Sequence, residues 1–267
     1  VVETVRREAE RYGIGIHHCE LVGLIPQEAL VDTAVWYTQL DQFDKSQILE
    51  TRLFDTPASP EPQGCPSFIE ELAAPTPTPG GGSAGAYAGA MGAGLVSMVA
   101  GLTIGKKKYA EVEAEMQAIR VMAEKLRADL TQAVDDDAAS FEVLMATFKF
   151  PKETDEQKEA RNSAIIQATL NAAHIPLNVS EDAVKVMELA FKCARDGNLN
   201  AISDSMSGFA MARAALTAAG YNVRINVNSL DDKSAGGKML NELVELEKKA
   251  DQLEKEIRKV MKERGGI

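Results

Sequence analysis

The sequence predicts an all-α protein in which most of the chain forms an elongated antiparallel helical bundle. Three observations carry this prediction. Aromatic residues make up only 5% of the 267 residues, Ala and Met are plentiful, and amphipathic segments follow one another from Gly80 to the end. Strands favour aromatic and β-branched residues, so this composition favours packed helices. The apolar share of 45% is enough for a sizeable core.

Residues 1–54 are expected to be a small α/β fragment. A charged helix is predicted over Glu3–Tyr12, followed by two short apolar runs, Gly13–His17 and Glu20–Ile25, that read as strands. A second helix is expected over Pro26–Leu40, because proline is common in the first turn of a helix. These elements are too few to bury a core alone, so we expect them to be the end of a larger domain.

Residues 55–79 are expected to form a linker. They include seven prolines, at positions 57, 60, 62, 66, 75, 77 and 79. Closely spaced prolines prevent long helices and central strands, because each lacks a backbone N–H and restricts the residue before it. Only Ser67–Ala74 is expected to form a short helix. A domain boundary is therefore predicted in this stretch.

Residues 80–267 are predicted to form a helical domain. The expected helices are Gly82–Thr103, Lys106–Phe148, Thr154–Ile175, Pro176–Arg195, Ser203–Tyr221 and Gly237–Arg264. The third and fourth are divided at Pro176, because proline disfavours a helical residue before it. In the last helix, apolar residues recur three and four positions apart between Leu243 and Val260, which is typical of helices packed side by side.

Gly81, Gly85, Gly89 and Gly92 lie on one face at the start of this domain. Small residues at this spacing let another backbone approach closely, so tight helix packing is the expected role. The uncharged stretch Ala84–Ile104 is long enough to span a membrane, but it holds few strongly lipophilic residues. We expect a buried helix and no membrane association.

Charge and residue content exclude several classes of protein. The formal net charge of −11 argues against nucleic acid as a partner, because phosphate binding requires clustered Lys and Arg. Cys19, Cys65 and Cys193 are too widely spaced to indicate a zinc motif or a disulfide framework, so a reducing, cytoplasmic location is expected. His174 is the only histidine after the linker. Neither a metal site nor a histidine-based triad is therefore expected in the helical domain.

Asp137 differs from its neighbours Asp135 and Asp136 by its position on the predicted helix. At about 100° per residue it falls within the apolar stripe, whereas the other two turn progressively away. The stripe consists of Leu126, Leu130, Val134, Phe141 and Leu144. A carboxylate there is costly unless it is paired or functional. Two interpretations stay open: a contact between helices, with Arg213 as candidate partner, or a catalytic group.

Four other polar segments each have a structural and a functional interpretation. The glycine-rich run Pro79–Ser83 can offer backbone N–H groups to an anion or simply pack tightly. Asn198–Asp204 can cap the next helix, and Lys106–Lys108 can be a solvated loop or grip the carboxylates of a ligand. Asn222–Asn226 has polar side chains on alternate residues, which would face the same way if the segment were extended.

In this order, these segments resemble the cyclodeaminase/cyclohydrolase family of folate enzymes. The matching strings are Pro79–Ser83, Leu102–Tyr109, Asp137–Phe141, Phe150–Lys152, Ile175–Leu177, Ser203–Asp204 and Asn222–Asn226. The resemblance runs from about Ser67 to the end. Residues 1–54, with the string Leu21–Leu30, are similar to the last part of a formiminotransferase domain, which favours the bifunctional formiminotransferase-cyclodeaminase type.

The resemblance implies conversion of 5-formiminotetrahydrofolate to 5,10-methenyltetrahydrofolate with release of ammonia, a step of histidine degradation and one-carbon metabolism. Folate is both substrate and carrier, so no other cofactor is expected, and the substrate is expected to be polyglutamylated. The family also implies a homo-oligomer, at least a dimer. Its transferase chemistry belongs to an earlier subdomain that this sequence lacks, so transferase activity is not expected.

We predict Asp137 as the principal catalytic carboxylate, with Asp204 lining the same pocket. The predicted substrate-binding residues are Gly80, Gly81, Gly82, Ser83, Lys106, Lys108, Asn198, Asn222, Arg224 and Asn226. Lys106 and Lys108 are expected to hold the anionic folate tail, with Arg224 a weaker candidate, and no metal ligand is predicted. Two alternatives stay open: a methenyltetrahydrofolate cyclohydrolase, and a non-enzymatic helical oligomerisation module. The second alternative predicts that Asp137 and Asp204 lie far apart or are tied up in structural contacts.

Overall fold

The computed structural model describes residues 2–17, 27–40, 43–44, 47 and 68–267. Contacts between residues divide the chain into two compact units, Val1–Cys65 and Pro66–Ile267. Their division falls inside the proline-rich stretch 55–79. The origin of the first unit in a formiminotransferase domain stays a prediction.

The described part of the first unit contains two helices, α1 (Val2–Arg11) and α2 (Gln27–Thr38). The strand expected over residues 13–17 is wrong, because this segment has no regular secondary structure. A strand requires a neighbour to pair with its backbone, and the described residues of this unit offer none. The second expected strand, Glu20–Ile25, and the string Leu21–Leu30 up to residue 26 lie outside the described residues.

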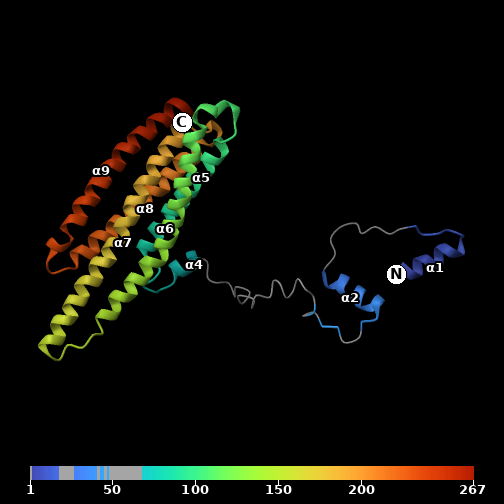
Figure 1. The fold of residues 1–267 in the computed structure, drawn as a ribbon, viewed down its shortest axis with the longest axis horizontal. Coiled ribbons are helices and arrows are strands. Elements are labelled where there is room, and N and C mark those ends of the chain that lie inside the picture. The colour runs from blue at the N-terminus through green and yellow to red at the C-terminus, as the bar shows by residue number, and fades with distance from the viewer. Residues whose placement is uncertain (1, 18–26, 41–42, 45–46, 48–67) are drawn as a thin grey trace. The chain divides into compact units, whose positions relative to one another are not determined.

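The second unit is an elongated bundle of antiparallel helices (Figure 1). Its helices are α4 (Phe68–Ala73), α5 (Gly81–Thr103), α6 (Glu113–Thr147), α7 (Asp155–Asp196), α8 (Ile202–Asn228) and α9 (Gly237–Val260). Residues 68–267 contain no strand, which confirms the predicted all-α bundle. A short 3-10 helix, Lys107–Val112, separates α5 from α6, so the long helix expected from Lys106 begins at Glu113, later than predicted.

The predicted division at Pro176 is also wrong, since α7 runs through it for 42 residues. Proline cannot donate a backbone hydrogen bond, which leaves the carbonyl four residues earlier without its helical partner. That carbonyl belongs to Ala172, and it accepts a hydrogen bond of 2.7 Å from Nδ2 of Asn226 in α8. A side chain from a neighbouring helix therefore replaces the bond that Pro176 removes, and α7 continues.

Helix α5 is the central helix of the bundle and contacts α6, α7 and α8. It is the one helix among the described residues that is long and apolar enough to cross a membrane. More than half of its most apolar window is buried inside the bundle. Packing between helices therefore accounts for its lack of charge.

The glycines of α5 permit unusually close contacts with its neighbours. A Cβ added to Gly92 would lie 2.7 Å from the carbonyl oxygen of Gly208 in α8, and one on Gly85 would lie 3.1 Å from Cβ of Ala218. A Cβ on Gly89 would lie 3.2 Å from Leu130 of α6. The prediction of tight helix packing along this face is confirmed.

Helix α9 covers α7 and α8 along the seam read from its sequence. Leu243, Ala250 and Ile257 are completely buried, and Leu246, Leu253 and Val260 pack against the core as partly buried residues. The spacing of three and four places all six on one side of the helix. The predicted seam is confirmed, although a short π-helical turn, Met261–Gly265, follows α9.

We expect Gly92→Ala to lower the free energy of unfolding by about 1–3 kcal/mol, because the methyl group would overlap the backbone of α8. The matched control is Gly94→Ala, where the nearest atom to an added Cβ is the flexible Cδ of Arg127, at 3.7 Å. That variant should gain about 0.5–1 kcal/mol from the better helix propensity of alanine. Urea unfolding measures both, and equal effects would contradict the close approach.

Candidate functional site

Asp137 of α6 lies against the first turn of α5. Its carboxylate accepts a hydrogen bond of 2.9 Å from the hydroxyl of Ser83, and the backbone N–H of Ser83 also interacts with it. The first N–H groups of a helix have no partner within the helix and carry partial positive charge. The first turn of α5 has no side-chain cap of its own at Gly80. Asp137 therefore supplies an anionic partner from a neighbouring helix.

Burial raises the pKa of Asp137 above its usual value, and the two interactions with Ser83 oppose that rise without cancelling it. A raised pKa brings the carboxyl closer to the range in which it can exchange a proton near neutrality. Asp135 and Asp136 are exposed, whereas Asp137 is half-buried. The position predicted for Asp137 within the apolar stripe is therefore confirmed, while its catalytic role stays a prediction.

Arg213 does not bind Asp137, so the helix-linking contact considered from the sequence is not formed. Its guanidinium instead donates to Asp251 of α9 and lies 3.8 Å from Glu254. Asp137 still has a structural role, because its carboxylate binds Ser83 in the first turn of α5. A role in joining helices and a role in chemistry are compatible at this position.

Gly82 leaves the space that the carboxylate occupies. A Cβ added to Gly82 would overlap the carboxylate of Asp137, with only 2.6 Å to its Cγ. Gly81, by contrast, is exposed, and its nearest neighbour would be Nδ2 of Asn222 at 3.6 Å. Within the glycine-rich run, Gly82 therefore leaves no room for a side chain, whereas Gly81 has room for one.

Asn222, Arg224 and Asn226 would point the same way only in an extended segment, and all three lie within α8. Residues two apart on a helix differ by about 200°. Asn222 lies beside Gly81, and Asn226 bonds to Ala172 of α7. Arg224 turns towards α9, where two hydrogen bonds of 2.9 and 2.7 Å join it to Glu247. Arg224 is therefore directed away from Asp137.

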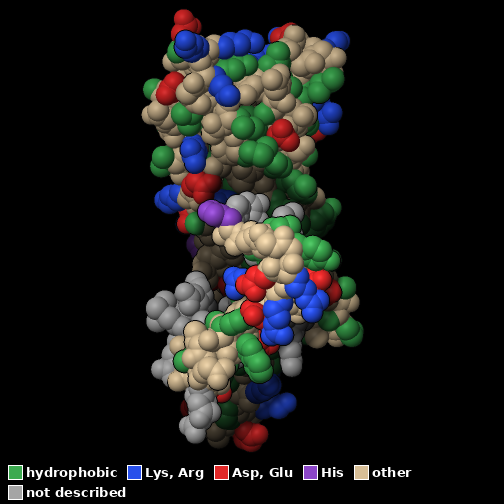
Figure 2. Space-filling model, turned by 90° about the vertical axis from the view of Figure 1, so that its right-hand side faces the viewer, with side chains coloured by type: hydrophobic (Ala, Val, Ile, Leu, Met, Phe, Trp, Pro, Cys, Tyr) green, Lys and Arg blue, Asp and Glu red, His purple; other side chains and the backbone are tan. Residues whose placement is uncertain are grey.

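The remaining predicted residues, Lys106, Lys108, Asn198 and Asp204, lie at the opposite end of the bundle. The side chain of Asn198 accepts from the N–H of Asn200 and donates to the carbonyl of Leu102 at the end of α5, so its observed role is capping. Figure 2 shows Lys and Arg side chains along the upper edge of the molecule, the end that carries the turn after α5 in Figure 1.

Asp204 does not line the pocket of Asp137 within one chain, which corrects that prediction. It lies in the first turn of α8, whereas Gly81 and Asp137 adjoin the last turns of α8 near Asn222. At 1.5 Å per helical residue, the two carboxylates are separated by on the order of 25 Å. The sequence could not reveal this separation, because it depends on the antiparallel packing of α5 and α8.

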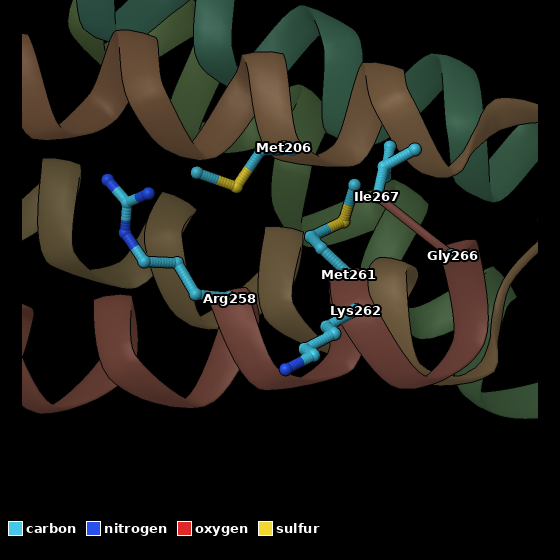
Figure 3. A pocket seen from close by; sticks show the side chains of 6 residues that line it. All are labelled: Met206, Arg258, Met261, Lys262, Gly266 and Ile267. Carbon is cyan, nitrogen blue, oxygen red and sulfur yellow. The ribbon is translucent and has the colours of Figure 1, made fainter.

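A cavity of about 820 Å³ lies far from Asp137, at the other end of α8. Figure 3 shows the side chains of Met206, Arg258, Met261 and Ile267 around it, with Lys262 turned away. A smaller groove of about 300 Å³ lies next to the Asp137 end of the bundle. Its lining residues are Pro77, Thr78, Phe141, Glu142, Met145, Ala146 and Lys149. Most of these were not recognised from the sequence, although Phe141, Met145 and Lys149 follow Asp137 at successive intervals of four.

The described residues contain no group of three or more His, Cys, Asp or Glu side chains arranged to hold a metal ion. Cys193 is buried in the core, and burial raises the pKa of its thiol to about 12. Such a thiol remains protonated and is a poor nucleophile.

A half-buried carboxylate of raised pKa beside a glycine-rich helix start makes this end of the helical bundle a candidate site for acid–base chemistry. Residues 64–245 match the family model of formiminotransferase-cyclodeaminase, and the chain belongs to this family. The methenyltetrahydrofolate cyclohydrolase of Methylorubrum extorquens is 43% identical over 73% of this chain and 94% of its own length. This relative is named as an enzyme that converts a folate.

Two further comparisons extend the relationship. The formimidoyltransferase-cyclodeaminase of Rattus norvegicus is 28% identical over 87% of this chain, and this chain spans 48% of that protein. The crystal structure of formiminotetrahydrofolate cyclodeaminase from Thermotoga maritima superposes with a TM-score of 0.67 at 29% identity, covering 76% of this chain and 97% of that chain. The family thus includes relatives that carry two different reaction names, and the structure of the cyclodeaminase shares the bundle.

We expect Gly82→Ala to lower the free energy of unfolding by about 1–3 kcal/mol and to displace the Asp137 carboxylate from the first turn of α5. Gly81→Ala is the matched control, because an added methyl group there has room. Thermal unfolding should separate the two variants. If both unfolded at the same temperature as the original protein, the contact between Gly82 and Asp137 would be refuted.

Proposed function

We propose that the protein is a formiminotetrahydrofolate cyclodeaminase and that Asp137 is its principal catalytic carboxylate. The observation that carries this proposal is a half-buried carboxylate of raised pKa held at the start of α5. The substrate carries a formimino group that is cationic near neutral pH. A carboxylate with little access to water would attract and orient that cation more strongly than one in bulk solvent.

The proposed reaction requires one proton to change position. N10 of the folate attacks the formimino carbon and forms a new C–N bond, which leaves a proton on N10. The carboxylate of Asp137 takes up this proton and delivers it to the departing nitrogen. The bond between that nitrogen and the carbon then breaks, releasing ammonia and the 5,10-methenyl cation. General acid–base catalysis of this kind contributes roughly 10²- to 10⁴-fold in rate.

A second candidate reaction is the hydrolysis of 5,10-methenyltetrahydrofolate. It is favoured by the 43% identity to a relative named as a methenyltetrahydrofolate cyclohydrolase. Water would attack the same cationic carbon that the first reaction produces, and Asp137 would accept a proton from that water. The cyclodeaminase reading is supported by matches of about 50 residues to glutamate formimidoyltransferases, for example 49% identity to that of Thermoplasma acidophilum. Assays of both reactions on the purified protein distinguish them.

The further features of the proposal follow from the folate chemistry. Tetrahydrofolate is both substrate and one-carbon carrier, so we propose no additional cofactor. We also propose that the substrate is polyglutamylated and that the protein acts in the cytoplasm, in histidine degradation. Gly81 and Asn222 adjoin the start of α5 beside Asp137 and are proposed to contact the substrate, whereas the buried Gly82 and Ser83 hold the carboxylate in place. Lys106, Lys108, Asn198 and Asp204 could join the same site only from a second copy of the chain.

We also propose that the protein is at least a dimer. Tyr87, Met91, Met98 and Leu102 form a stripe along α5, and each is between 38% and 45% exposed. An apolar stripe on an otherwise buried helix suits contact with another copy. A second copy packed antiparallel on this stripe would bring its Asp204 end towards Asp137. The non-enzymatic alternative predicted that Asp137 and Asp204 would lie far apart within one chain. In such a dimer, that distance is also compatible with an enzyme.

Asp137→Asn should fold and bind folate but lose turnover by about 10²- to 10⁴-fold, because the amide cannot carry the proton. Asp136→Asn is the matched control, since it changes the same charge one residue away on an exposed position. Rates of ammonia release and of methenyltetrahydrofolate hydrolysis provide the measurement. Equal losses in the two variants, or an active Asp137→Asn, would show that another group carries the reaction.

Light scattering should give a mass of at least twice the 28.8 kDa of one chain at micromolar concentration. Met98→Glu should shift the population towards single chains, because it places a charge in the exposed stripe of α5. A folded, monodisperse monomer of the unaltered protein would contradict the proposed dimer.

A further inference from the structure

The groove beside Asp137 has the length, lining and charge pattern of a site for the remainder of a folate molecule. Phe141 and Met145 lie one and two turns after Asp137 on α6, Lys149 lies in the turn that follows the helix, and all three line the groove. Side chains four apart on a helix are neighbours, so Phe141 and Met145 continue directly from the carboxylate. From Asp137 to Met145 this row spans roughly 12 Å at 1.5 Å per residue.

The opposite wall of the groove is formed by Pro77 and Thr78, in the segment between α4 and α5. This wall is held at both ends. Phe68 of α4 stacks on Tyr87 of α5 with ring centroids 4.6 Å apart, and Ala84 donates a backbone hydrogen bond to Gly80. Within the segment, the hydroxyl of Thr76 donates to the carbonyl of Thr78 at 3.0 Å. The wall is therefore built before any ligand binds.

Charge changes sign along the groove. Glu142 and Lys149 both line the groove, and Asp137 lies one turn before Phe141 on α6, beyond the acidic end of the lining. Lys149 is exposed and takes part in none of the ion pairs found among the described residues. Between the charged ends, the phenyl ring and the thioether provide an apolar surface suited to an aromatic ring.

We infer that this groove binds the p-aminobenzoylglutamate part of the substrate, with Lys149 holding a glutamate carboxylate. This inference rests on the proposed function and refines it. The cationic one-carbon centre would lie at Asp137, the benzoyl ring on Phe141 and Met145, and the carboxylate at the basic end. A volume of about 300 Å³ is at the lower limit of ligand pockets, which suits one part of a folate and not the whole molecule.

The test compares two probes, 5-formyltetrahydrofolate and the same compound without its glutamate, 5-formyltetrahydropteroate. The unaltered protein should bind the glutamate-bearing probe about five- to ten-fold more tightly, the size of an exposed charge-assisted contact. Lys149→Ala should abolish that preference and leave the affinity for the shorter probe unchanged. Phe141→Ala should weaken both probes alike, because it removes the surface under the ring.

Lys125→Ala is the control, since Lys125 is exposed on α6, about 30 Å along the helix from Met145, and should preserve the preference. Failure of both probes to bind the unaltered protein would overturn the proposed function itself. A preference for glutamate that persists in Lys149→Ala would overturn the groove and leave the function standing. If the unaltered protein bound both probes equally well, the groove assignment would also be overturned and the proposed function would stand.

Discussion

The close packing of α5 against its neighbours is the constraint on which the rest of the bundle depends. Glycine at positions 85, 89 and 92 lets α6 and α8 approach until backbone and side-chain atoms touch. At this separation the first turn of α5 meets Asp137 of α6, and Gly82 must lack a side chain to admit the carboxylate. The site is thus a consequence of helix packing, since the same glycine-rich surface continues from the core to the carboxylate.

Several polar residues that suggested ligand binding are used to hold helices together. Asn226 replaces the hydrogen bond that Pro176 removes from α7, and Arg224 joins α8 to Glu247 of α9. Asn198 caps the turn before α8. A partly buried polar group without a partner would cost free energy, so such residues are satisfied within the fold. The Asp137 end differs, because there a carboxylate retains a raised pKa next to an open groove.

The two reaction names among the relatives refer to one carbon atom. A cyclodeaminase forms the methenyl cation and a cyclohydrolase consumes it, and both need a group that stabilises positive charge and moves a proton. Under the proposed function, the half-buried carboxylate of Asp137 serves both needs. On that proposal, selection between ammonia and water depends on how the leaving or attacking group is held.

The sequence by itself determined the helices, the seam of α9 and the orientation of Asp137, because helical periodicity is a local property that apolar spacing records. It also indicated the glycine face of α5. Only the tertiary structure decided which residues meet. It separated Asp204 from Asp137 through antiparallel packing, carried α7 through Pro176 with a partner from α8, and joined Phe141, Met145 and Lys149 to a wall from the segment before α5. Such contacts depend on distances across the bundle, and no spacing along one helix specifies them.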